Sequence, residues 1–204
     1  MLDVKLYLRD RSPDVVAAWR EHFEGARNVD LSDGDIFAAG DAPTADAIVS
    51  PANSFGFMDG GIDAVYAQRF GPEMCQRLRT LIKAAWDGEM PVGCAAIVEA
   101  GDRVIPYVVS APTMRVPMDV SETVNAYLAF RAALIAVREA NRRKPGMIKS
   151  VLCPGLCTFY GQMSPDKSAR QMRFAHRLVA EGQTSLVDQA GKILHTHREL
   201  AAGK

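Results

Sequence analysis

The sequence lacks several features that would assign it to a special class of protein. No apolar run approaches the roughly 18–20 residues that a membrane-spanning helix needs. Lysine plus arginine and aspartate plus glutamate number 24 each, so the net charge does not favour a nucleic-acid partner, although a local basic patch remains an alternative. The first residues, MLDVKLYLRD, do not have the basic-then-apolar layout of a signal peptide. We therefore expect a soluble, cytoplasmic chain with no membrane partner.

Cysteine and histidine are also scarce, with four of each. There is no CxxC pair, and Cys153 and Cys157 lie in a segment that contains proline and glycine rather than in a clear helix. No histidine stands at zinc-site spacing from them. The sequence therefore predicts idle thiols in a reducing compartment, with no metal site and no resident cofactor.

What the chain does have is a regular alternation of strand and helix patterns. Strand patterns occur at residues 4–8, 28–31, 47–50, 93–98, 104–109 and 149–153. Helix patterns occur at 12–23, 63–70 and 73–86, after a cap at Asp119 or Ser121, after Ser164, and weakly over 185–200. Ser-Pro-Asp, at 12–14 and 164–166, is a typical helix start. Serine caps the N-terminus of a helix, proline suits the first turn, and an acid in that turn interacts favourably with the helix dipole. Strands separated by helices indicate a layered α/β domain with a largely parallel sheet.

Ligands of such sheets bind at the carboxyl ends of the strands. Loops rich in glycine, proline and small polar residues follow the strands that end near Leu31, Ser50 and Cys153. These three loops are therefore the candidate binding segments.

The second loop carries the most specific pattern, AIVSPANSFGFMDGGID from Ala47 to Asp63. Its glycines let backbone N–H groups approach phosphate oxygens, and the start of a helix favours the negative charge. Asn53 can exchange hydrogen bonds with sugar hydroxyls, and Asp63 can orient or activate a water near a sugar C1. Alternatively, Asn53 supports the turn and Asp63 caps the helix. Asp59 is expected to face solvent, because a carboxylate close to a diphosphate would repel it.

The other two loops each allow two interpretations. Asp35, in Gly34-Asp35-Ile36, can accept a hydrogen bond from an exocyclic amine such as that of adenine, or can bond the backbone of its own turn. The third loop, GLCTFYGQ from Gly155 to Gln162, suits phosphate binding and aromatic stacking. It also fits a plain strand–helix connection with Phe159 in the core.

Together the three loops resemble the macro domain, an ADP-ribose-binding α/β module. Gly34-Asp35-Ile36 is similar to the family's Gly-Asp-Ile element, and IVSPAN at 48–53 resembles its strand and Asn turn. Asn53, followed after six residues by Gly60-Gly61-Ile62-Asp63, is similar to the MacroD-type hydrolase signature. The resemblance runs from about Asp30 to Leu178.

This resemblance implies a three-layer α/β/α fold with a central mixed, largely parallel sheet flanked by helices. The whole of residues 1–204 would form a single macro-like domain. Its core would span about residues 30–180, with an N-terminal strand–helix unit and a C-terminal helix appended.

The resemblance also implies a role for each matching residue. Asp35 would hold the adenine amine, and Ile36 would add a backbone contact. Asn53 would bind the distal ribose, and Asp63 would position the attacking water, so these two are the catalytic candidates. The diphosphate would be bound by the backbone of Gly60, Gly61, Ile62, Thr158, Phe159, Tyr160 and Gly161. The departures from the family pattern are Ser50 for Asn, Met58 and Asp59 for Gly, Ala67 for His, and Thr158 or Phe159 for Gly.

The implied function is binding of ADP-ribose or a derivative. Hydrolysis of an ADP-ribosyl ester, on a mono-ADP-ribosylated protein or in O-acetyl-ADP-ribose, is implied by the hydrolase-type signature. The partner would be ADP-ribose or an ADP-ribosylated protein, and the mechanism needs no metal or cofactor. The alternatives are a non-catalytic module that recognises ADP-ribose, and a macro fold that binds another nucleotide.

Overall fold

The structure, a computed structural model, describes residues 2–202 and is built around one six-stranded sheet. The strands follow one another in space as β2-β1-β6-β3-β5-β4. Every neighbouring pair is parallel except β4 and β5. The strands are β1 Lys5–Asp10, β2 Val29–Asp33, β3 Ala47–Ser50, β4 Ala96–Glu99, β5 Tyr107–Ser110 and β6 Ser150–Cys153. The carboxyl ends of five strands therefore meet at one edge, which confirms the predicted sheet.

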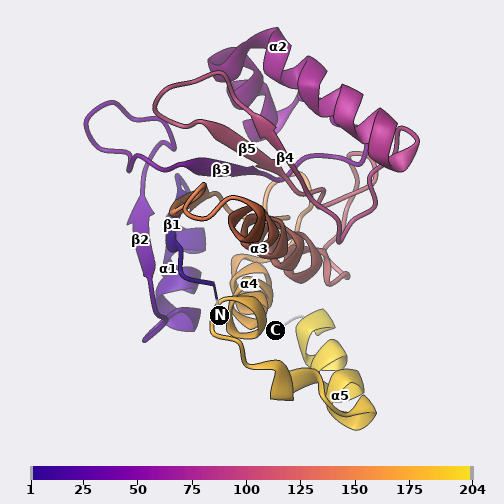
Figure 1. Ribbon diagram of the computed structural model, residues 1–204. Coiled ribbons are helices and arrows are strands. Elements are labelled where there is room, and N and C mark those ends of the chain that lie inside the picture. The colour runs from indigo at the N-terminus through magenta and orange to yellow at the C-terminus, as the bar shows by residue number, and fades with distance from the viewer. Residues whose placement is uncertain (1, 203–204) are drawn as a thin grey trace.

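Helices cover both faces of the sheet (Figure 1). One face packs against α2, and the other packs against α1, α3 and α4, while α5 lies farther out beyond α4. The helices are α1 Pro13–His22, α2 Gly61–Trp86, α3 Asn125–Arg143, α4 Pro165–Val179 and α5 Ala190–Ala201, with a 3-10 turn η1 at Thr184–Val187. This is the expected three-layer α/β/α arrangement.

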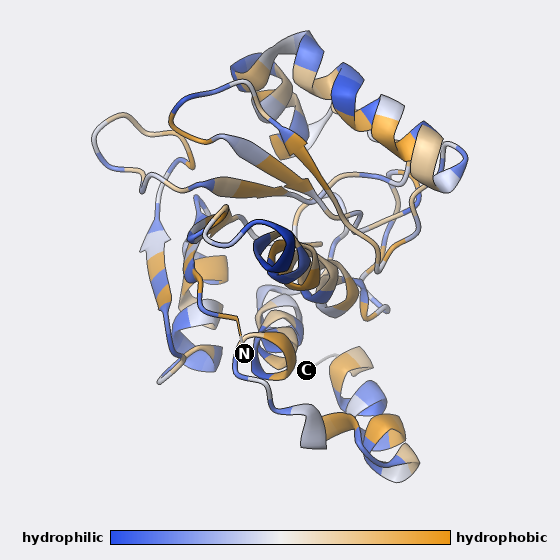
Figure 2. Cartoon of the chain, viewed as in Figure 1, coloured by the Kyte–Doolittle hydropathy of each residue, from blue (hydrophilic) through white to orange (hydrophobic). Residues whose placement is uncertain are grey.

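The period of two along the strands divides the core between these faces. In β3, Ala47 and Val49 join the apolar cluster under α1, α3 and α4, whereas Ile48 joins the cluster under α2. Figure 2 shows the sheet as a largely hydrophobic layer between helices that carry hydrophilic residues on their outer sides. Because both of their faces are buried, the central strands β3, β5 and β6 are largely apolar runs, whereas the edge strand β2 alternates in polarity.

Both predicted Ser-Pro-Asp helix starts are present. The Ser12 hydroxyl accepts a hydrogen bond from the Val15 N–H at 3.5 Å, and the Ser164 hydroxyl accepts one from Lys167 at 3.3 Å. The predicted interruption of α2 is also present, since Gly71 has φ +81° and ψ +171°. A side chain rarely adopts that conformation, so glycine there allows the helix to bend before Pro72.

Three expectations about the elements were wrong. Neither Asp119 nor Ser121 caps α3, which begins at Asn125; the Asp119 carboxylate instead accepts a hydrogen bond from the Ser121 N–H at 2.8 Å in a preceding turn. The weak pattern at 185–200 is a 3-10 turn followed by a separate helix. The N-terminal strand is not appended to the core, because β1 lies between β2 and β6.

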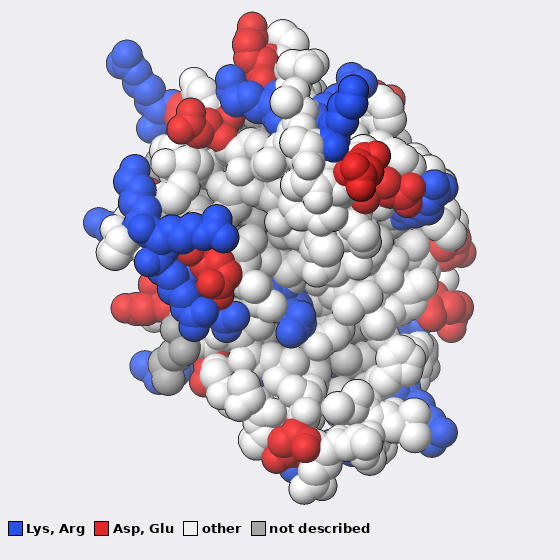
Figure 3. All heavy atoms as spheres, turned by 45° about the vertical axis from the view of Figure 1, so that its right-hand side comes forward, with Lys and Arg blue, Asp and Glu red and all other residues white. Residues whose placement is uncertain are grey.

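The surface carries no single dominant charge. In the view of Figure 3, most of the face is covered by uncharged residues, and Lys and Arg side chains gather along one edge. None of the helices within residues 2–202 combines the length and apolar character that crossing a membrane requires. The four cysteines are free thiols, of which Cys153 and Cys157 are buried.

Candidate functional site

A cavity of about 970 Å³ opens at the carboxyl edge of the sheet. Its walls come from the end of β1, from the loops after β2, β3 and β6, from the segment after β5, and from the starts of α1 and α2. A volume of this size is at the upper end of the range for cofactor and nucleotide sites. The parallel strands explain its position, because each delivers its following loop to the same edge.

All of the candidate residues from the three loops line this one cavity, although they are spread over more than 120 positions of the chain. They are Asp35, Ile36, Asn53, Gly60, Gly61, Ile62, Asp63, Thr158, Phe159, Tyr160 and Gly161. The structure thus places them together; which ligand atom each contacts remains a prediction.

Asp63 lies in the first turn of α2 and is the unusual acid of the site. Its Oδ1 accepts a hydrogen bond from the Ser50 hydroxyl at 2.5 Å. Burial in the floor of the cavity raises the pKa of Asp63 to about 7, against the opposing effect of the Ser50 hydrogen bond. Asp63 is therefore a carboxyl group that exchanges its proton near neutral pH.

The Asn53 side chain holds its own loop together. Its Oδ1 accepts hydrogen bonds from the N–H groups of Phe55 and Phe57 at 3.0 and 3.3 Å, and its Nδ2 donates to the Phe57 carbonyl at 2.8 Å. The amide group of asparagine has two donors and two acceptor positions. Asn53 lines the cavity, and one N–H of its amide group has no partner among residues 2–202. The turn-supporting alternative and a ligand contact are therefore compatible.

The start of α2 is the first of two segments of the cavity that can bind an anion. The N–H groups at a helix start have no partner within the helix, and their dipoles favour negative charge. Gly60 precedes the helix, and Gly61 has φ +55°. A Cβ on Gly61 would lie 3.0 Å from the Tyr160 ring, so glycine allows the two loops to approach each other across the cavity.

The loop after β6 is the second segment of the cavity that can bind an anion. Within residues 2–202, no N–H group from Thr158 to Gly161 donates to another residue of the chain, so these groups are free to bind a ligand. The loop is held from below, where the Gly155 N–H donates to the Asp10 carboxylate at 2.9 Å. The loop also contains Cys157 at φ +66°, a conformation that costs a residue with a Cβ free energy.

Two aromatic side chains of this loop face outward over the cavity. Phe159 is 81% exposed and Tyr160 is 56% exposed, and their rings meet edge to face with centroids 5.0 Å apart. The alternative that Phe159 lies in the core is therefore wrong. An aromatic ring left this exposed beside a cavity is available for stacking on a flat ligand.

The Asp35 end of the cavity contains two arginines that the sequence interpretation missed. Arg9 is 2% exposed; its Nε donates to the Asp35 carbonyl at 2.8 Å, and its guanidinium also pairs with Asp41. Arg11 forms an ion pair with the Asp35 carboxylate, which also accepts the Phe37 N–H at 2.7 Å. The only sign of this arrangement in the sequence was the presence of Arg9 and Arg11 directly after the apolar part of the first predicted strand.

The family departures lie at the edge of the cavity or below it. Met58 is buried, and its sulfur lies 3.9 Å from the Cys75 thiol, so it anchors the loop in the core under α2. Asp59 lines the cavity and is exposed, as expected for a residue that faces solvent. Ser50 is fully buried beneath Asp63.

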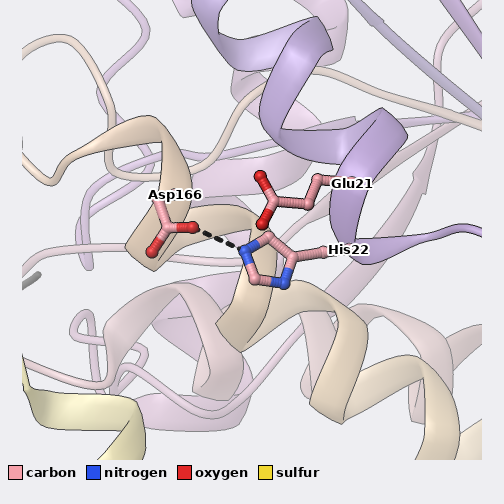
Figure 4. A group of neighbouring side chains, drawn as sticks. All are labelled: Glu21, His22 and Asp166. Carbon is pink, nitrogen blue, oxygen red and sulfur yellow. Dashed lines mark hydrogen bonds and ion pairs between the residues drawn. The ribbon is translucent and has the colours of Figure 1, made fainter.

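A cluster outside the cavity has the residue types of a metal site (Figure 4). Potential ligand atoms of Glu21, His22 and Asp166 all lie within 4.8 Å of one another. His22 Nε2 is 2.7 Å from Asp166 Oδ1, and the Arg170 guanidinium lies 3.9 Å from the other oxygen of Asp166. The guanidinium already supplies positive charge beside Asp166. The contacts are therefore accounted for by a hydrogen bond that joins α1 to α4 and an ion pair within α4.

Comparisons with known proteins relate the chain to one family. The family model described as Macro domain matches residues 49–172, more than half of the 204 residues. An uncharacterized protein of Aquifex aeolicus is 37% identical over 129 residues, 63% of this chain and 70% of the relative. An uncharacterized protein of Aeropyrum pernix is 32% identical over 155 residues, 76% of this chain and 74% of the relative.

Solved structures agree on the fold. The macrodomain of Mycobacterium tuberculosis DarG matches with a TM-score of 0.58 at 22% identity, covering 72% of this chain and 88% of that one. The Oceanobacillus iheyensis macrodomain with ADP matches with a TM-score of 0.53 at 17% identity, covering 68% and 72%. At these identities the likeness concerns the arrangement of the chain.

Proposed function

Because the chain belongs to the macro domain family, we propose that its cavity binds ADP-ribose and that it hydrolyses an ester-linked ADP-ribosyl group. The observation that carries this proposal is the position of Asp63, a carboxyl group with a pKa of about 7 in the floor of a cavity lined by both anion-binding loops. Structures of the Oceanobacillus iheyensis macrodomain include one with ADP and one, a Gly→Val mutant, with ADPR, which supports a ligand of this class.

The ligand would lie across the carboxyl edge of the sheet. The adenine amine would meet Asp35, at the end of the cavity that carries the arginines. The diphosphate would lie between the start of α2 and the loop at 158–161, whose free N–H groups suit phosphate oxygens. The distal ribose would then reach Asn53, which keeps one N–H group to donate, and Asp63.

The proposed reaction is attack of water on C1 of the distal ribose. The Asp63 carboxylate accepts a proton from the water as its oxygen bonds to C1. The bond between C1 and the ester oxygen breaks, and its electron pair leaves with the carboxylate of the modified side chain. The products are ADP-ribose with a hydroxyl on C1 and a free carboxylate, and the proton held by Asp63 then passes to solvent. A base with a pKa near 7 is well matched to this proton transfer at neutral pH.

Two measurements on the unmodified protein test the proposal. Calorimetric titration is expected to give affinity for ADP-ribose at least about tenfold above that for AMP, because AMP has no second phosphate or distal ribose to engage the two loops. Incubation with a protein that carries ester-linked mono-ADP-ribose is expected to release ADP-ribose. Binding without release would favour the non-catalytic module, and the absence of heat at millimolar ADP-ribose would contradict both functions.

Replacing Phe159 with alanine is expected to weaken ADP-ribose binding by about tenfold, because stacking on an aromatic ring contributes on the order of 1–3 kcal/mol. The ring is 81% exposed in the free protein, so thermal stability should stay close to that of the parent. Val104→Ala is the control, since Val104 is also exposed and apolar but does not line the cavity. Equal affinity of the two variants would show that Phe159 does not contact the ligand.

A further inference from the structure

Two serines on adjacent strands are buried behind Asp63, beneath the residues that line the cavity. Ser50 ends β3, Ser110 ends β5, and the parallel register pairs them directly. Both are fully buried. Two residues earlier, Ile48 and Val108 belong to the apolar cluster under α2. Because strand side chains alternate, both hydroxyls face α2, the helix that carries Asp63.

The two hydroxyls differ in what they contact. The Ser50 hydroxyl donates to Asp63 Oδ1 at 2.5 Å, which leaves its own lone pairs free to accept. The Ser110 Oγ is buried and has no hydrogen-bond partner among the described residues. Buried hydroxyls are nearly always satisfied, so this one needs a partner. Its register neighbour Ser50 offers the acceptor, either directly after a change of rotamer or through one bridging water.

We propose that Ser50 is a positioning residue for Asp63, with Ser110 supporting it from the neighbouring strand. Ser50 holds the carboxyl group toward the cavity and donates the hydrogen bond that favours its ionised form. The inference rests on the proposed role of Asp63 as the base of the hydrolysis. It assigns a task to Ser50, one of the residues at which the sequence departs from the pattern that it resembles.

Other ionisable groups around Asp63 do not titrate in its place. Burial raises the pKa of Tyr66 and of the Cys75 and Cys153 thiols, so all three stay protonated near neutral pH. The Asp10 carboxylate, at the end of β1, accepts the N–H groups of the Ser12 and Gly155 backbones at 2.9 Å each. Among the groups whose pKa is raised by burial here, Asp63 is therefore the one that exchanges a proton near pH 7.

The test is a carbon NMR titration of the Asp63 carboxyl group in the full-length protein. In Ser50→Ala its pKa is expected to rise by about one unit or more, because a charge-assisted hydrogen bond to the ionised form is lost. Ser50→Thr, which keeps the hydroxyl, is expected to restore the parent value. Ser110→Ala should cause a smaller rise. An unchanged pKa in Ser50→Ala would overturn the inference.

The control is Ser168→Ala, which also removes a buried hydroxyl, one that donates to the Leu156 carbonyl at 2.7 Å. It should leave the Asp63 pKa unchanged. Should Ser50→Ala not fold, Ser50→Cys carries the same expectation, because a thiol donates only a weak hydrogen bond.

Kinetics then connect this role to the reaction. In Ser50→Ala, kcat at pH 7 is expected to fall about fivefold for a rise of one pKa unit, because the ionised fraction of Asp63 at pH 7 falls from about one half to about one eleventh. It is expected to recover above about pH 9 and to leave KM within about threefold. A merely structural role would lower kcat equally at every pH. A parent protein without turnover would refute the proposed hydrolysis, while the NMR titration would still decide whether Ser50 controls Asp63.

Discussion

Asp63→Asn is expected to lower turnover of an ester-linked ADP-ribosyl substrate by roughly 10²–10⁴-fold, the usual contribution of a general base. The amide still accepts the Ser50 hydrogen bond, so the loop geometry is kept, but it cannot accept a proton from water. The affinity for ADP-ribose should stay within about threefold of the parent or increase, because a negative charge near the diphosphate is removed. Single-turnover kinetics and calorimetry separate these two effects.

The same substitution is expected to stabilise the protein, and the effect depends on pH. The folded-state pKa of Asp63, about 7, lies above its ordinary value, so the folded protein retains a proton that the unfolded chain releases. The stability of the parent therefore falls as pH rises from about 4 to 7, and the loss is complete above pH 7. Asparagine has no such cost, and denaturation at pH 8 should show a gain of up to about 4 kcal/mol.

The matched control is Asp59→Asn, which removes an exposed carboxylate four positions earlier, in the loop that precedes α2. We expect its turnover to stay within about threefold of the parent and its stability to remain unchanged at each pH, since surface charges contribute little. If Asp59→Asn lost turnover and Asp63→Asn did not, the assignment of the base would be wrong.

Gly161→Ala is expected to reduce both stability and ADP-ribose affinity. A Cβ at this position would lie 2.5 Å from the Cys157 carbonyl oxygen and 2.7 Å from Val120 Cγ2, so the loop backbone must move. Overpacking of this kind costs about 1–3 kcal/mol of unfolding free energy. Because the loop supplies free N–H groups to the cavity, its displacement should also weaken binding by about tenfold or more. Denaturant unfolding and calorimetric titration measure the two effects.

Gly191→Ala is the control for a glycine-to-alanine change outside the cavity. Gly191 lies in the first turn of α5, and a Cβ there would meet nothing within 4 Å. Alanine is expected to stabilise the helix by up to about 1 kcal/mol without any effect on binding. Retention of full affinity in Gly161→Ala would show that the diphosphate lies elsewhere.

Much of the site could be predicted because the decisive information is local. The Ser-Pro-Asp motifs start α1 and α4, and strand–helix alternation implies a parallel sheet. A parallel sheet sends its loops to one edge, so residues as distant as Asp35 and Tyr160 are brought to one cavity without any knowledge of their contacts.

The remaining features depend on contacts between distant segments. The pKa of Asp63 depends on its burial and on the hydrogen bond from Ser50, and the spacing of residues in the sequence predicts neither of them. The pairing of Arg11 with Asp35 joins two loops whose neighbourhood is set by the sheet order. The start of α3 was misplaced because two side-chain turns precede it: the Asp119 carboxylate accepts from the Ser121 N–H, and the Thr123 hydroxyl accepts from the Asn125 N–H. Such side chains form turns as readily as they cap helices.

The position of β1 in the sheet determines when its strand pairing can be completed as the chain is synthesised. β1 pairs with β6, which lies some 140 residues later in the chain, and Asp10 at its end holds Gly155. During synthesis the first strand must therefore wait, paired on one side only, until Cys153 has left the ribosome. Pairings this distant in sequence fold slowly and leave a strand edge exposed meanwhile. Truncation before β6 is therefore expected to yield an aggregating chain with no cavity.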